Sequence, residues 1–185
     1  MKKLLVGSEM DRMPGWAFKM MSMMFAFRDF FQDPGHKIDE FGIQPGMMVL
    51  DYGCGPGRHV PRAAELTGPT GLVYAMDIQE LSIKEVEKRI RKYKLVNVRP
   101  MLINELNLIQ DKSIDVIYAL DMFHMVSDPT DMLKKFHRVI KEHAALFLED
   151  GHQSRQSAKE KVMRSGFWEI TEEKPKYMKC SPKKF

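Results

Sequence analysis

The residues best placed to do chemistry are three glycines in the sequence VLDYGCGPGRHV, which occupies residues 49–60. Gly53, Gly55 and Gly57 lie between a short apolar segment and a predicted helix, where the lack of a Cβ atom lets the backbone approach a ligand. The free N–H groups at the start of that helix would bind a negative or polar group. Asp51 adds a carboxylate two residues before the first glycine. The pattern predicts a ligand-binding turn between a strand and a helix.

The elements that must position this turn alternate between strands and helices. Strands are predicted at 47–53, 72–77, 97–103, 113–120 and 144–150, and helices at 58–67, 83–94, 128–142 and 154–166. The chain would close with a hairpin around Lys174–Pro175. This order predicts an α/β fold with a doubly wound, mostly parallel seven-stranded Rossmann-like sheet and an antiparallel C-terminal hairpin. Ligands of such sheets bind beyond the carboxyl ends of the strands, where the strand order reverses.

The glycine spacing separates two classes of nucleotide-binding turn. The dinucleotide pattern G-x-G-x-x-G, started at Gly53, would require a third glycine where Arg58 stands. The observed spacing is D-x-G-x-G-x-G. An NAD-dependent oxidoreductase is therefore the weaker interpretation of this turn.

The sequence DYGCGPG, preceded by FGIQPGMMVL and followed by a second predicted strand that ends at Asp77, resembles the first motif of the class I S-adenosylmethionine-dependent methyltransferases. More narrowly, residues 41 to 149 resemble the small stand-alone type-11 group, which is related to the quinone-biosynthesis methyltransferases. The resemblance implies S-adenosylmethionine as cofactor, S-adenosylhomocysteine as product and no metal. KEHAA at 141–145 replaces the Lys-Pro-Gly-Gly turn usual in the family, which changes a turn and leaves the cofactor pocket intact.

The resemblance also implies roles for the glycine turn. Asp51 and the backbone around Gly53 and Gly55 would hold the methionine end of the cofactor, whose ammonium group needs hydrogen-bond acceptors. Cys54 and Gly57 belong to the same turn, and we expect Cys54 to be structural rather than reactive.

Residues after the second and third strands would hold the nucleoside. The resemblance implies that Asp77 accepts hydrogen bonds from both ribose hydroxyls and that Ile78 gives the adenine an apolar face. Asn104 stands where the family usually has aspartate, and its amide oxygen can still accept a hydrogen bond from the adenine amino group. Glu105, one residue further along, is the neighbouring candidate.

The segment after the fourth strand would face the reacting groups. Ala119 and Leu120 would lie near the cofactor sulfonium. His124 is the candidate catalytic base, because an unperturbed pKa near 6.5 suits proton removal at neutral pH. The alternative is a loop histidine that packs beside the cofactor or caps a backbone carbonyl. Three further residues at this edge are candidates for contact with the substrate: Asp121, Asp150 and His152.

The N-terminal part of the chain is rich in methionine, with six of the chain's 16 between Met10 and Met24. Residues 14–31, PGWAFKMMSMMFAFRDFF, predict a helix with a wide apolar arc. We expect residues 1–40 to form a helical lid over a binding domain at 41–185. A dimer contact and a membrane-surface helix are the alternatives.

Composition excludes several classes of protein. The 185 residues are 44% hydrophobic and 29% charged, which disfavours disorder and coiled coil. No stretch approaches the roughly 20 apolar residues of a membrane span. The apolar run Leu4 to Val6 is too short for a signal peptide. The two cysteines, Cys54 and Cys180, cannot form a disulfide framework, so a reducing cytoplasm is expected.

The expected function is methyl transfer to a small, fairly apolar acceptor by a monomer or homodimer. Methylation of RNA or protein is the first alternative; the basic residues near the C-terminus favour it slightly, despite a net charge of only +4. No aromatic and basic patch for a nucleic acid is visible. The second alternative is a non-catalytic module that binds S-adenosylmethionine.

Overall fold

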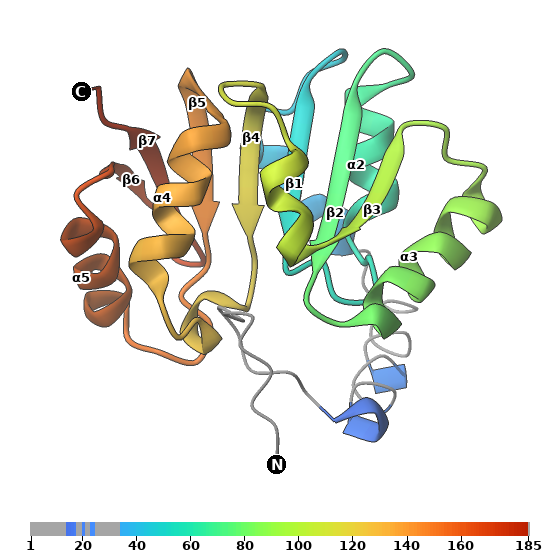
Figure 1. The fold of residues 1–185 in the computed structure, drawn as a ribbon, viewed down its shortest axis with the longest axis horizontal. Helices are drawn as coiled ribbons and strands as arrows, with labels where there is room; N and C mark the ends of the chain where they lie inside the picture. Colours follow the sequence, from blue (N-terminus) through green and yellow to red (C-terminus); the bar gives the residue numbers. More distant parts are fainter. Residues whose placement is uncertain (1–13, 18–19, 21–22, 25–33, 185) are drawn as a thin grey trace.

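The computed structural model describes residues 14–17, 20, 23–24 and 34–184 and shows the predicted alternation of strands and helices (Figure 1). Three short 3-10 helices lie at Pro34–Phe41 (η1), Ile103–Leu108 (η2) and Phe123–Met125 (η3). The α-helices are α2 (Val60–Thr67), α3 (Glu80–Tyr93), α4 (Pro129–Val139) and α5 (Arg155–Ser165). The strands are β1 (Met48–Tyr52), β2 (Leu72–Asp77), β3 (Val98–Leu102), β4 (Ile114–Ala119), β5 (Ile140–Leu148), β6 (Trp168–Glu173) and β7 (Met178–Pro182).

The seven strands form one sheet in the order β3-β2-β1-β4-β5-β7-β6. Strands β1 to β5 are parallel, and β7 runs antiparallel to both β5 and β6. The predicted mostly parallel sheet and its antiparallel C-terminal hairpin are confirmed. The strand order reverses between β1 and β4, so ligands are expected beyond the carboxyl ends of these two strands.

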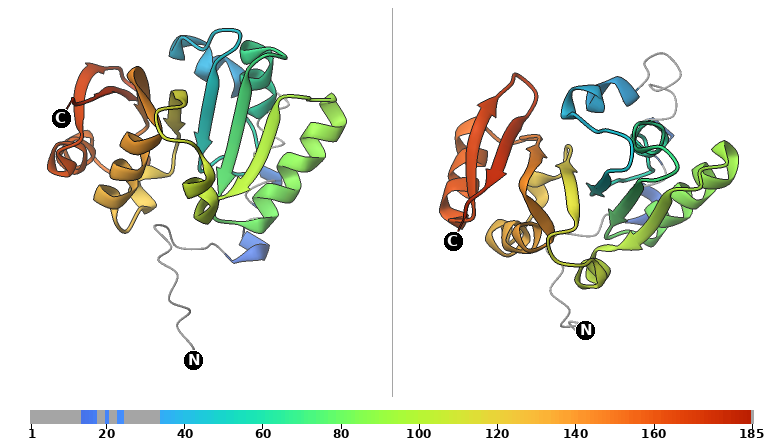
Figure 2. Two further views of the ribbon diagram at one scale, coloured as in Figure 1. Left: turned by 45° about the horizontal axis from the view of Figure 1, so that its top comes forward. Right: turned by 90° about the horizontal axis from the view of Figure 1, so that it is seen from above.

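Helices cover both faces of this sheet, as the two further views show (Figure 2). Alternate residues of a strand point to opposite faces. Val49 of β1 joins a cluster with η1 and α2, whereas Leu50 joins a cluster with α4, α5 and η2. Helix α3 packs through Val86 against Ala75 of β2, on the same side as α2. Strands buried on both faces explain why β1, β2 and β4 are nearly continuous apolar runs.

The boundary between α4 and β5 differs from the prediction. The helix ends at Val139 rather than 142, and the strand begins at Ile140 rather than 144. Ile140 is fully buried and pairs with Ile114 of β4, followed by a shift in register. The next three residues, 141–143, are exposed and polar. The sequence therefore predicts the first two of them as the end of the helix, although all three belong to the strand.

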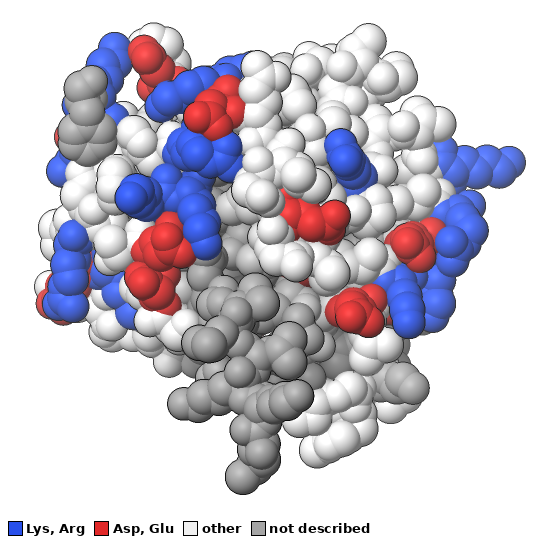
Figure 3. All heavy atoms as spheres, viewed as in Figure 1, with Lys and Arg blue, Asp and Glu red and all other residues white. Residues whose placement is uncertain are grey.

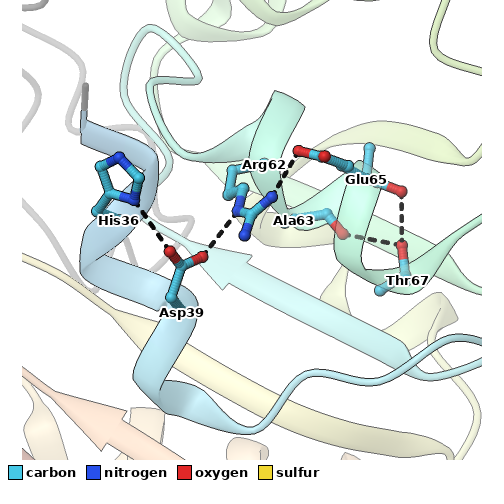
Figure 4. A network of polar contacts seen from close by, with 7 residues as sticks. His36, Asp39, Arg62, Ala63, Glu65 and Thr67 are labelled. Atoms are coloured by element: carbon cyan, nitrogen blue, oxygen red, sulfur yellow. Dashed lines mark hydrogen bonds and ion pairs between the residues drawn. The ribbon is translucent and has the colours of Figure 1, made fainter.

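The segment before β1 forms η1, which ends one residue beyond the segment 1–40 expected to be helical. Asp39 of η1 accepts hydrogen bonds from Arg62 Nε of α2 at 2.7 Å and pairs with His36 at 3.1 Å (Figure 4). The hydrogen bond from Arg62 holds the pKa of Asp39 below its usual range. Phe41 stacks on Phe147 of β5 with ring centroids 4.1 Å apart. These contacts fasten η1 to one face of the sheet.

The predicted helix 14–31 is described only in part. Residues 15–17, 20, 23 and 24 are helical, and the rest of its interior lies outside the described residues. Within this segment, four of the described side chains are large, apolar and exposed: Trp16, Met20, Met23 and Met24. Within the described part of the chain, no helix combines the length and apolar character needed to cross a membrane.

Candidate active site

The glycine turn joins the carboxyl end of β1 to α2 and is held by β2. The N–H groups of Gly53 and Cys54 both donate to the carbonyl of Met76, at 2.8 and 2.9 Å. The N–H of Gly55 donates to Asp77 Oδ2 at 2.8 Å. The structure therefore brings together the two motifs that the sequence singled out.

The three positions of the turn are glycine for different structural reasons. All have positive φ, at 77°, 52° and 74° for Gly53, Gly55 and Gly57. A Cβ on Gly53 would lie 2.8 Å from Met122 Cγ, and one on Gly57 would lie 2.9 Å from Val86 Cγ2. A Cβ on Gly55 would meet nothing within 4 Å. Packing therefore accounts for two of the glycines, whereas a side chain at Gly55 would extend into open space.

Asp77 is the acidic residue at the end of β2. It is 6% exposed, and Oδ1 accepts a hydrogen bond from Gln79 N at 2.8 Å while Oδ2 binds Gly55 N. Burial raises the pKa of this carboxyl, and the N–H donors of Gln79 and Gly55 oppose the rise. The Ser82 hydroxyl and Ile78 N act in the same direction as these two donors, so polar groups of this chain surround the carboxylate.

Asp51 is almost wholly buried, at 2% exposure, and pairs in register with Tyr118 of β4. Its Oδ2 and the Tyr118 hydroxyl are buried without a hydrogen bond of normal geometry to any described residue. Burial raises the pKa of Asp51 to about 8; the nearby Tyr118 hydroxyl opposes the rise, and the charge of Asp77 adds to it. A buried carboxylate oxygen that lacks a donor fits a ligand ammonium group. Tyr118 is not among the residues expected from the sequence, although the pairing of β1 with β4 places it beside Asp51.

The remaining residues expected around the cofactor differ in their burial and hydrogen bonds. Cys54 is buried, its thiol donates to the carbonyl of Gly55 at 3.6 Å, and burial raises its pKa well above the usual value. Ile78 is 7% exposed beside Asp77. Asn104 is exposed on η2. Glu105 accepts a hydrogen bond from Leu102 N at 2.7 Å, so this carboxylate holds the start of η2.

The carboxyl ends of β4 and β5 lie side by side. Glu149 N donates to the carbonyl of Ala119 at 3.1 Å, and Ala119 is fully buried. Leu120 is half-buried. Asp121 is exposed and has a positive φ of 54°, a conformation that residues other than glycine adopt rarely. The segment then turns Met122 back onto Gly53, so it adjoins the glycine turn.

Of the residues expected to meet the substrate, the structure brings His124 and His152 together. Their rings meet edge to face with centroids 4.9 Å apart. Asp150 instead receives two hydrogen bonds from Arg155 Nε, at 2.8 and 2.7 Å. Arg155 in turn donates to the carbonyl of Lys174 at 3.0 Å, so Asp150 helps to fasten the C-terminal hairpin. In the part of the chain that the structure describes, no three His, Cys, Asp or Glu side chains gather as a metal site would require.

Comparison with known proteins places the chain in a family. Residues 43–183 match a family described as a methyltransferase domain. Demethylmenaquinone methyltransferases from Geobacillus sp. (strain WCH70) and Geobacillus stearothermophilus are 26% and 29% identical to the chain over 125 residues. These matches cover 67% of the chain and 53% of each relative, so the chain spans about half the length of the curated relatives it matches.

Solved structures show the same fold over nearly the whole chain. A SAM-dependent methyltransferase from Aquifex aeolicus aligns with a TM-score of 0.74 at 25% identity, covering 92% of this chain and 97% of that one. A protein from Methanococcus maripaludis, named as a putative methyltransferase of the same cofactor, aligns with a TM-score of 0.71 at 16% identity, over 96% and 97% of the two chains. The chain belongs to the methyltransferase domain family, among the class I S-adenosylmethionine-dependent methyltransferases.

Proposed function

We propose that this chain transfers the methyl group of S-adenosylmethionine to a small, fairly apolar acceptor. The observation that carries the proposal is the open space at Gly55, bordered by the Asp77 carboxylate and near the unpartnered oxygen of Asp51. A ribose diol could share the Asp77 carboxylate with its backbone donors, and an ammonium group is the donor that the Asp51 oxygen lacks. Both belong to S-adenosylmethionine, and NAD has no ammonium group to match Asp51.

Different residues around this space would hold different parts of the cofactor. Asp51 and the turn at Gly53, Cys54, Gly55 and Gly57 would hold the methionine end, and Asp77 the ribose. Ile78 would pack on the adenine, whose amino group would meet the oxygen of Asn104 rather than Glu105, since Glu105 already binds Leu102 N. Ala119 and Leu120 would lie near the sulfonium.

When bound, the cofactor supplies an electrophilic methyl carbon for in-line displacement. The protein then contributes orientation and the exclusion of water. The buried end of β4 and the packing of Met122 on Gly53 make this edge of the sheet apolar next to the glycine turn. Apolar surroundings favour an acceptor that presents apolar surface.

The acceptor class is supported by two observations. The matched relatives are named for demethylmenaquinone, and this molecule is a quinone with an apolar tail. On the face shown in Figure 3, basic and acidic side chains are interspersed over α5 and the C-terminal strands. Lys159 pairs with Glu173, and Lys174 pairs with Glu172. A surface of paired charges favours a small molecule over RNA, which would require an unpaired basic face.

We also propose that residues 1–40 act as a lid over this site. Gly15 supports the proposal, because a Cβ at that position would lie 3.4 Å from Leu81 Cδ1 in the first turn of α3. Helix α3 begins three residues after Asp77, so the described start of the lid is near the cofactor edge. Lys37 of η1 bonds Glu149 at 2.6 and 2.7 Å and ties the same segment to the end of β5. A cytoplasmic location, and a monomer or homodimer, complete the proposal.

The proposal is tested by incubating the protein with S-adenosylmethionine and chemically reduced demethylmenaquinone that carries a single isoprene unit. Mass spectrometry should detect S-adenosylhomocysteine and a singly methylated product in equal amounts. Release of S-adenosylhomocysteine with RNA, and not with the quinol, would favour the macromolecular alternative. Binding of S-adenosylhomocysteine with no turnover on any acceptor would favour the non-catalytic module.

A further inference from the structure

His124 is enclosed by two residues that follow β5. A Cβ atom on Gly151 would overlap His124 Nδ1 and lie 2.9 Å from both Cε1 and Cγ of the ring. Gly151 has a φ of 66°, so the position is restricted both by its backbone and by the ring that covers it. His152, the next residue, contacts the same ring edge to face. The imidazole of His124 therefore rests on a backbone surface that only glycine provides.

The Nδ1 atom of His124 is buried and has no hydrogen-bond partner among the described residues. A structural histidine usually has at least one ring nitrogen fixed by a carbonyl or carboxylate, which would raise its basicity. Here the ring is held by packing instead. The alternative role of capping a backbone carbonyl through Nδ1 does not fit this geometry.

The charges around His124 favour the neutral ring. Burial is the largest cause that lowers its pKa, and His152 and Lys161 of α5 also lower it. Asp121 acts in the opposite direction. The neutral imidazole is the form that can accept a proton, so the surroundings keep His124 ready to act as a base at neutral pH.

The position of His124 adjoins the cofactor turn. It lies two residues after Met122, which packs on Gly53, and its loop follows the end of β4 at the point where the strand order reverses. Other candidate bases at this edge are less suited: Asp150 is bound by Arg155, and Asp121 is exposed.

We propose that His124 is the base that takes a proton from the acceptor, that Gly151 and His152 are its positioning residues, and that the acceptor is a nucleophile bearing an ionisable proton, such as a hydroquinone or phenol. This inference rests on the proposed methyl transfer. In the reaction the acceptor loses a proton to Nε2 of His124, since Nδ1 is buried against Gly151, and forms a bond to the methyl carbon. The bond between that carbon and the sulfonium sulfur breaks, and its electron pair remains on sulfur as a neutral thioether. The proton then leaves to water.

The first test is a double-mutant cycle on the reduced single-isoprene demethylmenaquinone. His124→Asn should lower kcat about 100-fold or more, as loss of a general base does. Gly151→Ala should lower kcat at least tenfold and have little further effect when His124 is already asparagine. Gly166→Ala is the matched control, because Gly166 also has a positive φ of 80° but its Cβ would meet nothing within 4 Å. Equal losses in the two glycine variants, or additive losses in the cycle, would overturn the positioning role.

The second test does not depend on turnover. Nitrogen-15 NMR of the histidine rings, in protein saturated with S-adenosylhomocysteine, should show His124 titrating below pH 6.5. His152→Ala and Gly151→Ala should each raise that pKa, whereas His143→Ala, on an exposed part of β5, should not. A His124 that titrates above 6.5 and ignores both variants would contradict the arrangement.

The outcomes separate this inference from the proposed function. Failure to bind S-adenosylhomocysteine in calorimetry would remove the proposed function itself. Turnover that is confined to acceptors without an ionisable proton, such as a thioether or a tertiary amine, would leave methyl transfer standing and overturn the base. A kcat/KM profile that rises with pH through the pKa of His124, and loses this rise in His124→Asn, is the expected result.

Discussion

The two halves of the sheet's carboxyl edge are built in different ways. At the ends of β1 and β2, Asp77 accepts hydrogen bonds from two backbone N–H groups, those of Gly55 and Gln79. At the ends of β4 and β5, His124 is held by packing against Gly151 and His152, and its buried Nδ1 has no partner among the described residues. Hydrogen bonds therefore fix the acidic side chain of the first half, whereas packing fixes the histidine of the second. The difference indicates that cofactor affinity and acceptor chemistry can be altered separately.

The largest expected loss of ligand affinity follows from removing the Asp77 carboxylate. Asp77→Ala should weaken binding of S-adenosylhomocysteine at least about 100-fold, or about 2.7 kcal/mol, because the ribose and Gly55 N both lose their acceptor. Isothermal titration measures the loss. Asp115→Ala is the matched control, since Asp115 also accepts a backbone hydrogen bond, from Met48 N at 2.9 Å. Asp115 lies near the start of β4, at the edge of the sheet opposite the glycine turn. Equal affinity losses in the two variants would mean that Asp77 acts only through stability.

Asp51 gives the half at β1 and β2 a dependence on pH. Its folded pKa of about 8 lies above the unfolded value of 3.8, so the folded protein holds an extra proton between these values and loses stability as pH rises through them. Between pH 5 and 8 the ligand-free protein should lose about 1–4 kcal/mol relative to Asp51→Asn. Urea unfolding at both pH values checks this difference. Parallel pH curves for the two proteins would show that Asp51 is ionised in the folded state.

Two glycine substitutions sharpen the distinction between packing and binding within the turn. Gly57→Ala should lower the free energy of unfolding by about 2–5 kcal/mol, because backbone strain adds to the overlap with Val86. Gly55→Ala should cost only the strain, about 1–2 kcal/mol, yet weaken cofactor binding about tenfold. Thermal unfolding and calorimetry separate the two effects. Unchanged affinity in Gly55→Ala would place the cofactor elsewhere.

The sequence predicts the half of the site at β1 and β2 better than the half at β4 and β5. The motif around Asp51 and Gly55 is local, so its strand, turn and helix were all predicted. Packing between distant segments decided the remainder, including the early start of β5 at Ile140 and the contact between His124 and Gly151. Gly151 had a visible signal, a glycine directly after a predicted strand, but only the structure shows which side chain requires it.

The smallest expected effect concerns the ion pair that joins η1 to the end of β5. The ion pair of Lys37 and Glu149 has side chains 28% and 19% exposed, so a double-mutant cycle with Lys37→Met and Glu149→Gln should give a coupling of about 0.5–1 kcal/mol. The Lys88 and Glu85 pair, at 62% and 37% exposure, serves as a more exposed control and should give less. Chemical unfolding provides both values. A larger coupling in the exposed pair would argue against η1 as an anchor.

The central claim is that the glycine turn and Asp77 bind S-adenosylmethionine. The most direct measurement is parallel isothermal titration of the folded protein with S-adenosylmethionine, S-adenosylhomocysteine and NAD. Micromolar binding of the first two and no binding of NAD is the predicted result. Binding of NAD alone, or of none of the three by protein that unfolds cooperatively, would contradict the account.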